Sequence, residues 1–276
     1  MVITSLQDRV QLHNGVTMPG FGLGVYKVEN GKTTIESVRA AIEHGYRLID
    51  TASYYENEEG VGIGVKESGV PREELFITTK VWNDQHGYDN TLRAFDDSLK
   101  KLGMDYVDLY LIHWPVTGKF PETWKALERL YDEGVVRAIG VSNFHVHHLE
   151  KLFVRANEKP VVNQVECHPH LTQEELRAFC EKENIQMEAW SPLKKARILD
   201  LPLFVELGGK YGKTPAQIIL RWHVQNNIIP IPKSTKPERI KENADIFDFS
   251  LTEAEMEQIS GLNINDRCGS NPDTFV

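Results

Sequence analysis

The chain of 276 residues is predicted to fold as a closed (β/α)8 barrel that forms a single domain over residues 1–276. Eight short, largely apolar segments alternate with segments of helical periodicity, the pattern of a parallel sheet covered by helices. No composition break or Gly/Ser-rich linker divides the chain, and barrels of this length are common as single units. A doubly wound open sheet is the alternative, but it would carry a glycine-rich fingerprint after its first strand. The glycines within residues 20–24 precede that strand and have the wrong spacing.

Each element follows from its local pattern. The Asn-Gly pair at residues 14–15 predicts an N-terminal β-hairpin between residues 10–12 and 16–18, which we expect to close the bottom of the barrel. Thr172 and Glu175 predict a capping box at the start of one helix. The eight strands are expected at residues 23–26, 47–50, 76–81, 107–112, 135–141, 161–165, 186–190 and 228–231. The helices are expected at residues 33–44, 58–66, 88–102, 120–133, 146–156, 172–183, 214–225, 237–244 and 252–260.

Composition and charge narrow the class of protein. The chain is 41% hydrophobic and 26% charged, which is typical of a soluble globular protein with a substantial core. Its net charge of −9 argues against nucleic acid or an anionic membrane as a partner, because both are bound by neutralising phosphates with Lys and Arg. The three cysteines are odd in number and lack CxxC spacing, and residues 1–10 do not resemble a secretory signal. We therefore expect a cytoplasmic protein, a monomer whose partner is a small molecule.

Polar side chains recur where the predicted strands end, and in a barrel these ends form the active-site face. Asp50 ends the second strand, Lys80 lies near the end of the third, His113 follows the fourth, and Tyr55 lies in the loop after Asp50. Taken singly, each has a structural explanation, such as a turn cap, a helix contact, a surface lysine or a hydrogen-bonded core histidine. Together at the carboxyl-terminal end of one barrel, they form a proton donor and the groups that adjust its pKa.

The phenol of Tyr55 is the expected donor. A phenol with a pKa near 10 is a poor acid at neutral pH, and lowering that pKa by about two units requires roughly 2.7 kcal/mol. An ammonium about 4 Å away supplies roughly 4 kcal/mol at an effective dielectric constant of about 20, so Lys80 is expected to lower it. Asp50 would hold Lys80 in place, and His113 would orient a carbonyl oxygen. None of these side chains is a reductant, so the site implies a cofactor.

Other residues at the strand ends suit a nicotinamide nucleotide. Ser142, Asn143 and Gln164 can hydrogen-bond a carboxamide, and Trp190 offers a flat face for a ring. The basic residues between 233 and 239, beside a predicted helix start, favour a phosphate. A solvated helix start is the alternative explanation of this basic cluster.

With these residues in place, the chain resembles the aldo-keto reductase family over essentially its whole length. The motifs that carry the resemblance occur in the family's order: Gly-Tyr-Arg-Leu-Ile-Asp-Thr-Ala-Ser-Tyr-Tyr-Glu-Asn-Glu at 45–58, Leu-Ile-His-Trp-Pro at 111–115, Gly-Val-Ser-Asn-Phe at 140–144, Asn-Gln-Val-Glu-Cys-His-Pro at 163–169 and Ile-Pro-Lys-Ser at 231–234. The resemblance implies a TIM barrel that binds NADPH without a Rossmann loop. It implies Tyr55 as the general acid, with Asp50, Lys80 and His113 completing the catalytic set.

The same resemblance assigns the remaining site residues. The carboxamide would be held by Ser142, Asn143 and Gln164, with Trp190 stacked on the nicotinamide. The 2′-phosphate would be bound by Lys233, Ser234 and Arg239, and the adenine would lie near Glu242 and Asn243. The substrate side would be lined by Tyr26, Trp82 and Trp114.

Two features of the chain bear on substrate and cofactor. The short tail after Asn265 is similar to that of the bacterial glyoxal/methylglyoxal and diketogluconate reductase branch, and implies an open pocket for small aldehydes, ketones and dicarbonyls. The loop that begins with Ser191 and Leu193, both expected to contact the cofactor, commonly contains glycine in the family. Here it continues as Lys-Lys-Ala-Arg at 194–197.

Three other interpretations compete with this one. A metal site could use the histidines at 145, 147 and 148, or Cys167, His168 and His170, but the first group does not share one helix face well and the second has no evident carboxylate. We expect no metal. A Schiff-base enzyme using Lys80 would leave Tyr55 and the basic cluster unexplained. A non-enzymatic, NADPH-binding redox-sensing partner protein is the third alternative.

Overall fold

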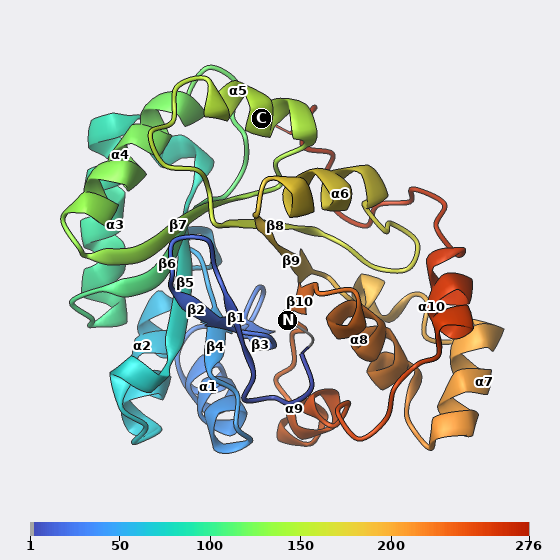
Figure 1. The fold of residues 1–276 in the computed structure, drawn as a ribbon. Coiled ribbons are helices and arrows are strands. Elements are labelled where there is room, and N and C mark those ends of the chain that lie inside the picture. The colour runs from blue at the N-terminus through green and yellow to red at the C-terminus, as the bar shows by residue number, and fades with distance from the viewer. Residues whose placement is uncertain (1–2, 276) are drawn as a thin grey trace.

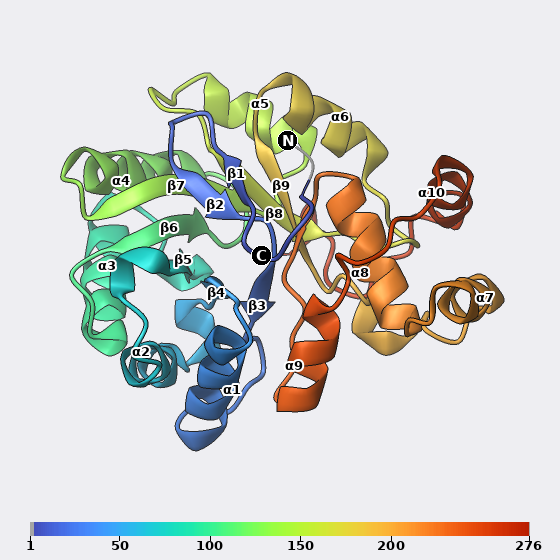
Figure 2. The same cartoon turned by 60° about the horizontal axis from the view of Figure 1, so that its bottom comes forward.

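The computed structural model describes residues 3–275 and contains an eight-stranded parallel sheet ringed by helices, as predicted for a TIM barrel (Figures 1 and 2). Each strand is hydrogen-bonded to the next one along the chain, in the order β3 to β10. The strands are β3 (Gly22–Gly24), β4 (Leu48–Asp50), β5 (Phe76–Val81), β6 (Val107–Ile112), β7 (Val136–Ser142), β8 (Val162–Glu166), β9 (Gln186–Trp190) and β10 (Ile229–Pro230).

The first and last strands of the barrel meet at Gly24. Its backbone N–H donates to the carbonyl oxygen of Pro232, 3.3 Å away and just beyond β10. A Cβ atom at position 24 would lie 2.9 Å from the carbonyl oxygen of Ile231, so the close approach depends on glycine. Gly24 therefore serves barrel closure, whereas Gly22 makes room for the side chain of Leu48 on the neighbouring strand β4.

The helices cover the outer face of the sheet, and a continuous core of aliphatic and aromatic side chains fills the space between the two layers. The strands β4, β5, β6 and β8 are buried along their whole length, because helices cover one face and the barrel interior the other. The helices are α1 (Lys32–Glu43), α2 (Glu58–Glu67), α3 (Tyr88–Leu102), α4 (Phe120–Asp132), α5 (Val146–Phe153), α6 (Glu174–Lys182), α7 (Pro202–Tyr211), α8 (Pro215–Gln225), α9 (Pro237–Ala244) and α10 (Glu253–Ser260).

A separate antiparallel hairpin, β1 (Arg9–Gln11) and β2 (Thr17–Pro19), covers the amino-terminal ends of the strands. The guanidinium of Arg9 donates to the carbonyl oxygen of Glu74, which precedes β5. The side-chain amide of Asn14 donates to the carbonyl oxygen of Arg137, near the start of β7. The hairpin closes the bottom of the barrel as predicted, and the functional groups gather at the opposite end.

Two local predictions were wrong. Helix α7 was missed because two adjacent glycines interrupt its apolar pattern, although Gly208 is what lets the helix pack against the carbonyl oxygen of Lys213. The predicted capping box at Thr172 does not form, because Gln173, in a left-handed conformation with φ of 58°, is the cap and α6 begins at Glu174. In the described part of the chain, no helix has the length and apolar character needed to cross a membrane.

Candidate active site

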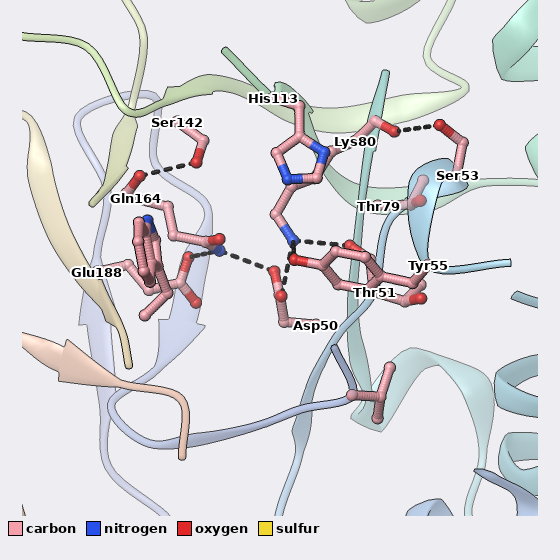
Figure 3. Close-up of polar contacts among 12 residues, drawn as sticks. Asp50, Thr51, Ser53, Tyr55, Thr79, Lys80, His113, Ser142, Gln164 and Glu188 are labelled. Carbon is pink, nitrogen blue, oxygen red and sulfur yellow. Dashed lines mark hydrogen bonds and ion pairs between the residues drawn. The ribbon is translucent and has the colours of Figure 1, made fainter. Parts of the chain in front are cut away.

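Lys80 lies at the centre of a polar cluster at the carboxyl ends of the strands (Figure 3). Its ammonium donates to Oδ1 of Asp50 at 2.7 Å, to the carbonyl oxygen of Thr51 at 2.8 Å, and to the phenolic oxygen of Tyr55 at 3.3 Å. Asp50 ends β4, and a short 3-10 turn, Ser53–Tyr55, brings the phenol back over the neighbouring strand β5. The side chains of Asp50 and Lys80 are almost completely buried. Local chain geometry thus assembles the predicted acid and its two partners.

The pKa of Tyr55 is raised, which contradicts the lowering expected from the sequence. Burial raises the pKa of Tyr55 well above its usual value, and the negative charge of Asp50 adds to this effect. The sequence argument counted the ammonium of Lys80 alone, whereas Asp50 balances that charge at a shorter distance. Tyr55 therefore keeps its proton throughout the physiological pH range. It can donate that proton only to a strong base, such as the alkoxide that develops when a carbonyl is reduced.

His113 follows β6 directly and is also placed in the site. Its ring lies edge-on to that of Tyr55, with centroids 5.7 Å apart. Burial, reinforced by the positive charge of Lys80, holds the pKa of His113 well below its usual value. The imidazole is therefore neutral, and it can donate one hydrogen bond without placing a second cation beside Lys80.

Ser142 and Asn143 lie at the end of β7 and are hydrogen-bonded within the protein. Asn143 has a left-handed backbone with φ of 65°, and its amide nitrogen donates to the carbonyl oxygen of His113 at 2.9 Å and to Oγ of Ser142 at 3.1 Å. Oδ1 of Asn143 accepts from the indole N–H of Trp190 at 2.9 Å. In this structure these side chains brace the strand ends and orient Trp190. Their role toward a carboxamide stays a prediction.

Gln164, in β8, connects the catalytic cluster to β9. Its side-chain nitrogen donates to Oδ2 of Asp50 and to Oε2 of Glu188, both at 2.7 Å (Figure 3). Glu188 is fully buried and was not identified from the sequence. The alternating pattern of β9 offered a signal, because a carboxylate at the centre of an apolar strand has to be paired or neutral.

A cavity of about 1140 Å³ opens at this mouth and extends from the catalytic cluster to the start of α9. Lys80 lies beneath its floor. The other predicted site residues all line it: Tyr26, Asp50, Tyr55, Trp82, His113, Trp114, Ser142, Asn143, Gln164, Trp190, Ser191, Leu193, Lys233, Ser234, Arg239, Glu242 and Asn243. Their convergence on one long cavity is what a dinucleotide with a substrate at one end requires.

The basic cluster forms the end of the cavity that is remote from Tyr55. The side chains of Lys233 and Arg239 are exposed to it, while Ser234 is buried. Oγ of Ser234 accepts from the backbone N–H of Lys236 at 3.1 Å, which fixes the chain just before α9. Glu242, on α9, accepts from the threonine hydroxyl that caps α8 at 3.0 Å. Two helix starts therefore face the same space as Lys233, Lys236 and Arg239, three cations that form no ion pair within residues 3–275.

The loop after β9 takes a glycine-like conformation without glycine. Lys194, Lys195 and Ala196 have φ of 47°, 54° and 65°, and a left-handed non-glycine residue costs about 1 kcal/mol or more. Lys194 turns away from the cavity and pairs with Asp266, so its charge is neutralised there. Lys195 and Arg197 line the cavity, so the loop presents two cations to it.

The carboxyl-terminal tail forms part of the cavity wall, which the sequence interpretation missed. The ring of Phe275 lies 4.4 Å, centroid to centroid, from that of Trp114. Glu166 accepts the backbone N–H groups of Cys268 and Gly269 at 2.5 and 3.0 Å, and any Cβ at position 269 would collide with the Trp190 ring. The tail therefore forms one wall of the cavity, and the expectation of an open pocket stays a prediction.

The histidines at 145, 147 and 148 converge on Asp273 of the tail, although spacing along a helix argued that they would not. The rule fails because His145 is the cap that precedes α5 and not a helical residue. Nδ1 of His148 accepts from the backbone N–H of His145, and Nε2 of His145 accepts from Arg267. The other nitrogen of each ring then carries the proton and faces the carboxylate of Asp273, at 3.5 Å and 3.2 Å respectively. Metal binding would require those nitrogens to be unprotonated.

A second convergent group consists of Glu166, His168 and Cys268. Burial opposes ionisation of Glu166, but hydrogen bonds from His168 and from the tail outweigh it and hold its pKa at about 2. Burial raises the pKa of the Cys268 thiol to about 11, so it is not a thiolate ligand at neutral pH. This cluster is best explained as the anchor of the tail.

The fold and this cavity define a class: an oxidoreductase barrel that uses a nicotinamide nucleotide. Residues 20–264 match the family model described as Aldo/keto reductase family, and the chain belongs to this family. Glyoxal reductase of Bacillus subtilis (strain 168) is 60% identical over 273 residues, which cover 99% of each chain. Methylglyoxal reductase DkgA of Escherichia coli (strain K12) is 46% identical over 270 residues, or 96% of this chain and 97% of that one.

A solved structure of a Gox0644 mutant in complex with NADPH matches with a TM-score of 0.93 at 45% identity, covering 98% of this chain and 99% of that one. These comparisons confirm the predicted family, fold and cofactor.

Proposed function

We propose that this chain reduces small aldehydes, ketones and dicarbonyls, such as glyoxal and methylglyoxal, to alcohols with NADPH. The observation that carries the proposal is the hydroxyl of Tyr55, held 3.3 Å from the ammonium of Lys80 at the floor of the cavity. NADPH, when bound, supplies a hydride to the carbonyl carbon. The cavity suits this cofactor because it joins an amide-lined end at Gln164 to a basic end at Lys233 and Arg239.

The chain's own residues bind the carbonyl and supply the proton. The neutral imidazole of His113 and the phenol of Tyr55 both face the carbonyl oxygen and orient it. As negative charge develops on that oxygen, Tyr55 transfers its proton to it. The resulting phenolate is stabilised by the ammonium of Lys80, and Asp50 holds that ammonium in place. Lys80 therefore stabilises the phenolate that proton transfer leaves on Tyr55, and it has little effect on the neutral phenol before the reaction.

The aromatic wall supports small carbonyl substrates. Tyr54 stacks on Trp82 with centroids 3.7 Å apart, and Phe275 packs against Trp114, so the cavity wall beside the acid is aromatic. Tyr26 completes the wall at 5.0 Å from the ring of Tyr55. The names of the two relatives, glyoxal reductase and methylglyoxal reductase, point to the same substrate class.

The decisive experiment replaces the acid. Tyr55→Phe should lower kcat by about 10²- to 10⁴-fold, the usual contribution of a general acid, while the Kd of NADPH stays within about twofold. Tyr54→Phe is the matched control, because Tyr54 is exposed and the hydrogen bonds of the Lys80 ammonium within residues 3–275 go to Asp50, Thr51 and Tyr55. If Tyr55→Phe keeps most of its kcat, the acid assignment is wrong. If the wild-type chain binds NADPH but reduces none of glyoxal, methylglyoxal, aromatic aldehydes and keto sugars, the redox-sensing alternative replaces this proposal.

The setting in which the chain acts is also a proposal. We infer a cytoplasmic monomer that binds no nucleic acid and forms no metal site. The net charge of −9 and three cysteines that form no disulfide support this inference. A sedimentation mass of twice 31.5 kDa would remove the monomer assignment.

A further inference from the structure

Glu188 is a buried carboxyl group that has no role in the hydride and proton transfers proposed above. It lies in β9, none of its surface is exposed, and Oε1 has no hydrogen-bond partner among residues 3–275. Burying a carboxyl group without full hydrogen bonding is unfavourable, so its retention calls for an explanation. Within residues 3–275 its side chain makes one hydrogen bond, which Oε2 accepts from the side-chain nitrogen of Gln164 at 2.7 Å.

The side-chain nitrogen of Gln164 has two hydrogens, and two carboxyl groups take both. Asp50 accepts one through Oδ2 and Glu188 accepts the other through Oε2, each at 2.7 Å (Figure 3). An amide rotated by 180° would place its oxygen against both acceptors, so only one orientation is allowed. Gln164 lines the cavity, and its oxygen is the amide atom that neither carboxyl group contacts.

We propose that Glu188 is a positioning residue for the reaction: together with Asp50 it fixes the Gln164 amide so that only its oxygen is offered to the carboxamide NH₂ of the nicotinamide. The inference rests on the proposed function, since it assumes that the nicotinamide lies beside Gln164. A cofactor bound through its carboxamide presents one ring face to the substrate, so orientation of this amide determines both affinity and hydride geometry.

The protonation state of Glu188 adds a second consequence. Burial, reinforced by the negative charge of Asp50, raises the pKa of Glu188 to about 8, while Gln164 and Lys80 oppose that rise. The charged or titratable groups that act on it are Asp50 on β4, Lys80 on β5 and Tyr55 on the turn after β4. At neutral pH Glu188 is mostly a neutral acid that still accepts through Oε2. At alkaline pH it becomes a carboxylate that favours the cationic, oxidised nicotinamide over the reduced one.

Two substitutions separate these contributions. Glu188→Gln keeps an acceptor oxygen and resembles the neutral acid, whereas Glu188→Met removes the acceptor at similar length. At pH 6.5, Glu188→Gln should bind NADPH within about twofold of the wild-type Kd. Glu188→Met should weaken NADPH about threefold to tenfold, the usual range for one hydrogen bond. The matched control is Glu58→Gln, since Glu58 is equally buried, also has an unpaired oxygen and does not line the cavity.

Binding of both cofactor forms over pH gives a readout that does not depend on turnover or on Glu188→Met folding. In wild-type protein the ratio of the Kd of NADPH to the Kd of NADP⁺ should rise between pH 6.5 and pH 9, and in Glu188→Gln it should stay nearly flat. A Glu188→Gln curve that follows wild type, or a Glu188→Met variant with wild-type affinity, would overturn the inference alone. Wild-type protein that fails to bind NADPH would instead overturn the proposed function.

Discussion

The carboxylate of Asp50 and the ammonium of Lys80 form an ion pair of 2.7 Å in which both side chains are almost entirely removed from solvent. Such a pair offers little net stability relative to apolar residues, but removing one partner leaves a buried, unpaired charge and costs about 3–5 kcal/mol. The pair is therefore retained for what it does to its neighbours, since Lys80 contacts Tyr55 and Asp50 contacts Gln164.

This relationship predicts a difference between single and double substitutions. Lys80→Met should lower the free energy of unfolding by about 3–5 kcal/mol, because it strands Asp50. The double variant with Asp50→Asn should recover part of that loss, since the buried charge is gone, yet it should remain without turnover because nothing stabilises the phenolate of Tyr55. Urea unfolding and kcat measured on the same samples provide the check. Additive losses of stability in the double variant would contradict the coupling.

The sequence was sufficient for the barrel and for most of the cavity, because a parallel barrel brings all strand ends to one face. Asp50, Lys80 and His113 could be placed together from their positions at strand ends alone. Glu188 could not be assigned to the site in this way, because its role depends on the hydrogen bond between its carboxyl group on β9 and the amide of Gln164 on the neighbouring strand β8. The pKa of Tyr55 was misjudged for the same reason, because burial and the balance of charges depend on three-dimensional distances.

The tail was the other limit of prediction. Nothing in the local pattern of residues 266–275 shows where a segment without helix or strand will lie. Its path is fixed by long-range contacts, such as those of Glu166 with two backbone N–H groups and of Asp273 with three histidines. The Lys-rich loop after β9 shows the same limit, because the sequence does not distinguish Lys194, which is paired with Asp266, from Lys195 and Arg197, which line the cavity.

The basic end of the cavity predicts selectivity between cofactors. Lys233→Ala and Arg239→Ala should each weaken NADPH by about tenfold or more, the value of a hydrogen bond between charged groups. The Kd of NADH should change by less than twofold, because NADH lacks the 2′-phosphate. Lys241→Ala, an exposed cation on α9 outside the cavity lining, is the control. Equal losses for both cofactors would remove the 2′-phosphate role.

The tail predicts a selective effect on substrates. Asp273→Asn should weaken the contacts with the histidines at 145, 147 and 148 and release Phe275 from Trp114. The side chain of Asp273 is partly exposed, so its ion pairs with the histidines are weak and we expect KM to change only about twofold to fivefold. That effect should appear as a lower KM for bulky aromatic aldehydes, with the KM of methylglyoxal unchanged. Hydrogen exchange of residues 268–275 should increase in the variant but not in the control Asp132→Asn. Unchanged exchange would mean that the cluster does not hold the tail.

Acid sensitivity should be traceable to His86. This residue is 3% exposed between a short turn and α3, and burial, reinforced by the positive charge of Lys119, lowers its pKa to about 4. The unfolded chain takes up a proton near pH 6.5 that the folded chain resists, so the free energy of unfolding falls as pH drops from 6.5 toward 4. Between pH 7 and pH 5 the loss from this group is about 2 kcal/mol.

In His86→Gln that part of the pH dependence should disappear, because the replacement cannot be protonated in either state. Urea unfolding of both proteins at pH 7 and pH 5 provides the measurement, with the half-buried His44 at the end of α1 as the site of a control substitution. The difference between the two pH values should shrink by about 2 kcal/mol in His86→Gln and stay the same in His44→Gln. Parallel pH profiles for wild type and His86→Gln would show that His86 takes up its proton equally in the folded and the unfolded chain, and that the acid lability arises at other buried histidines such as His223.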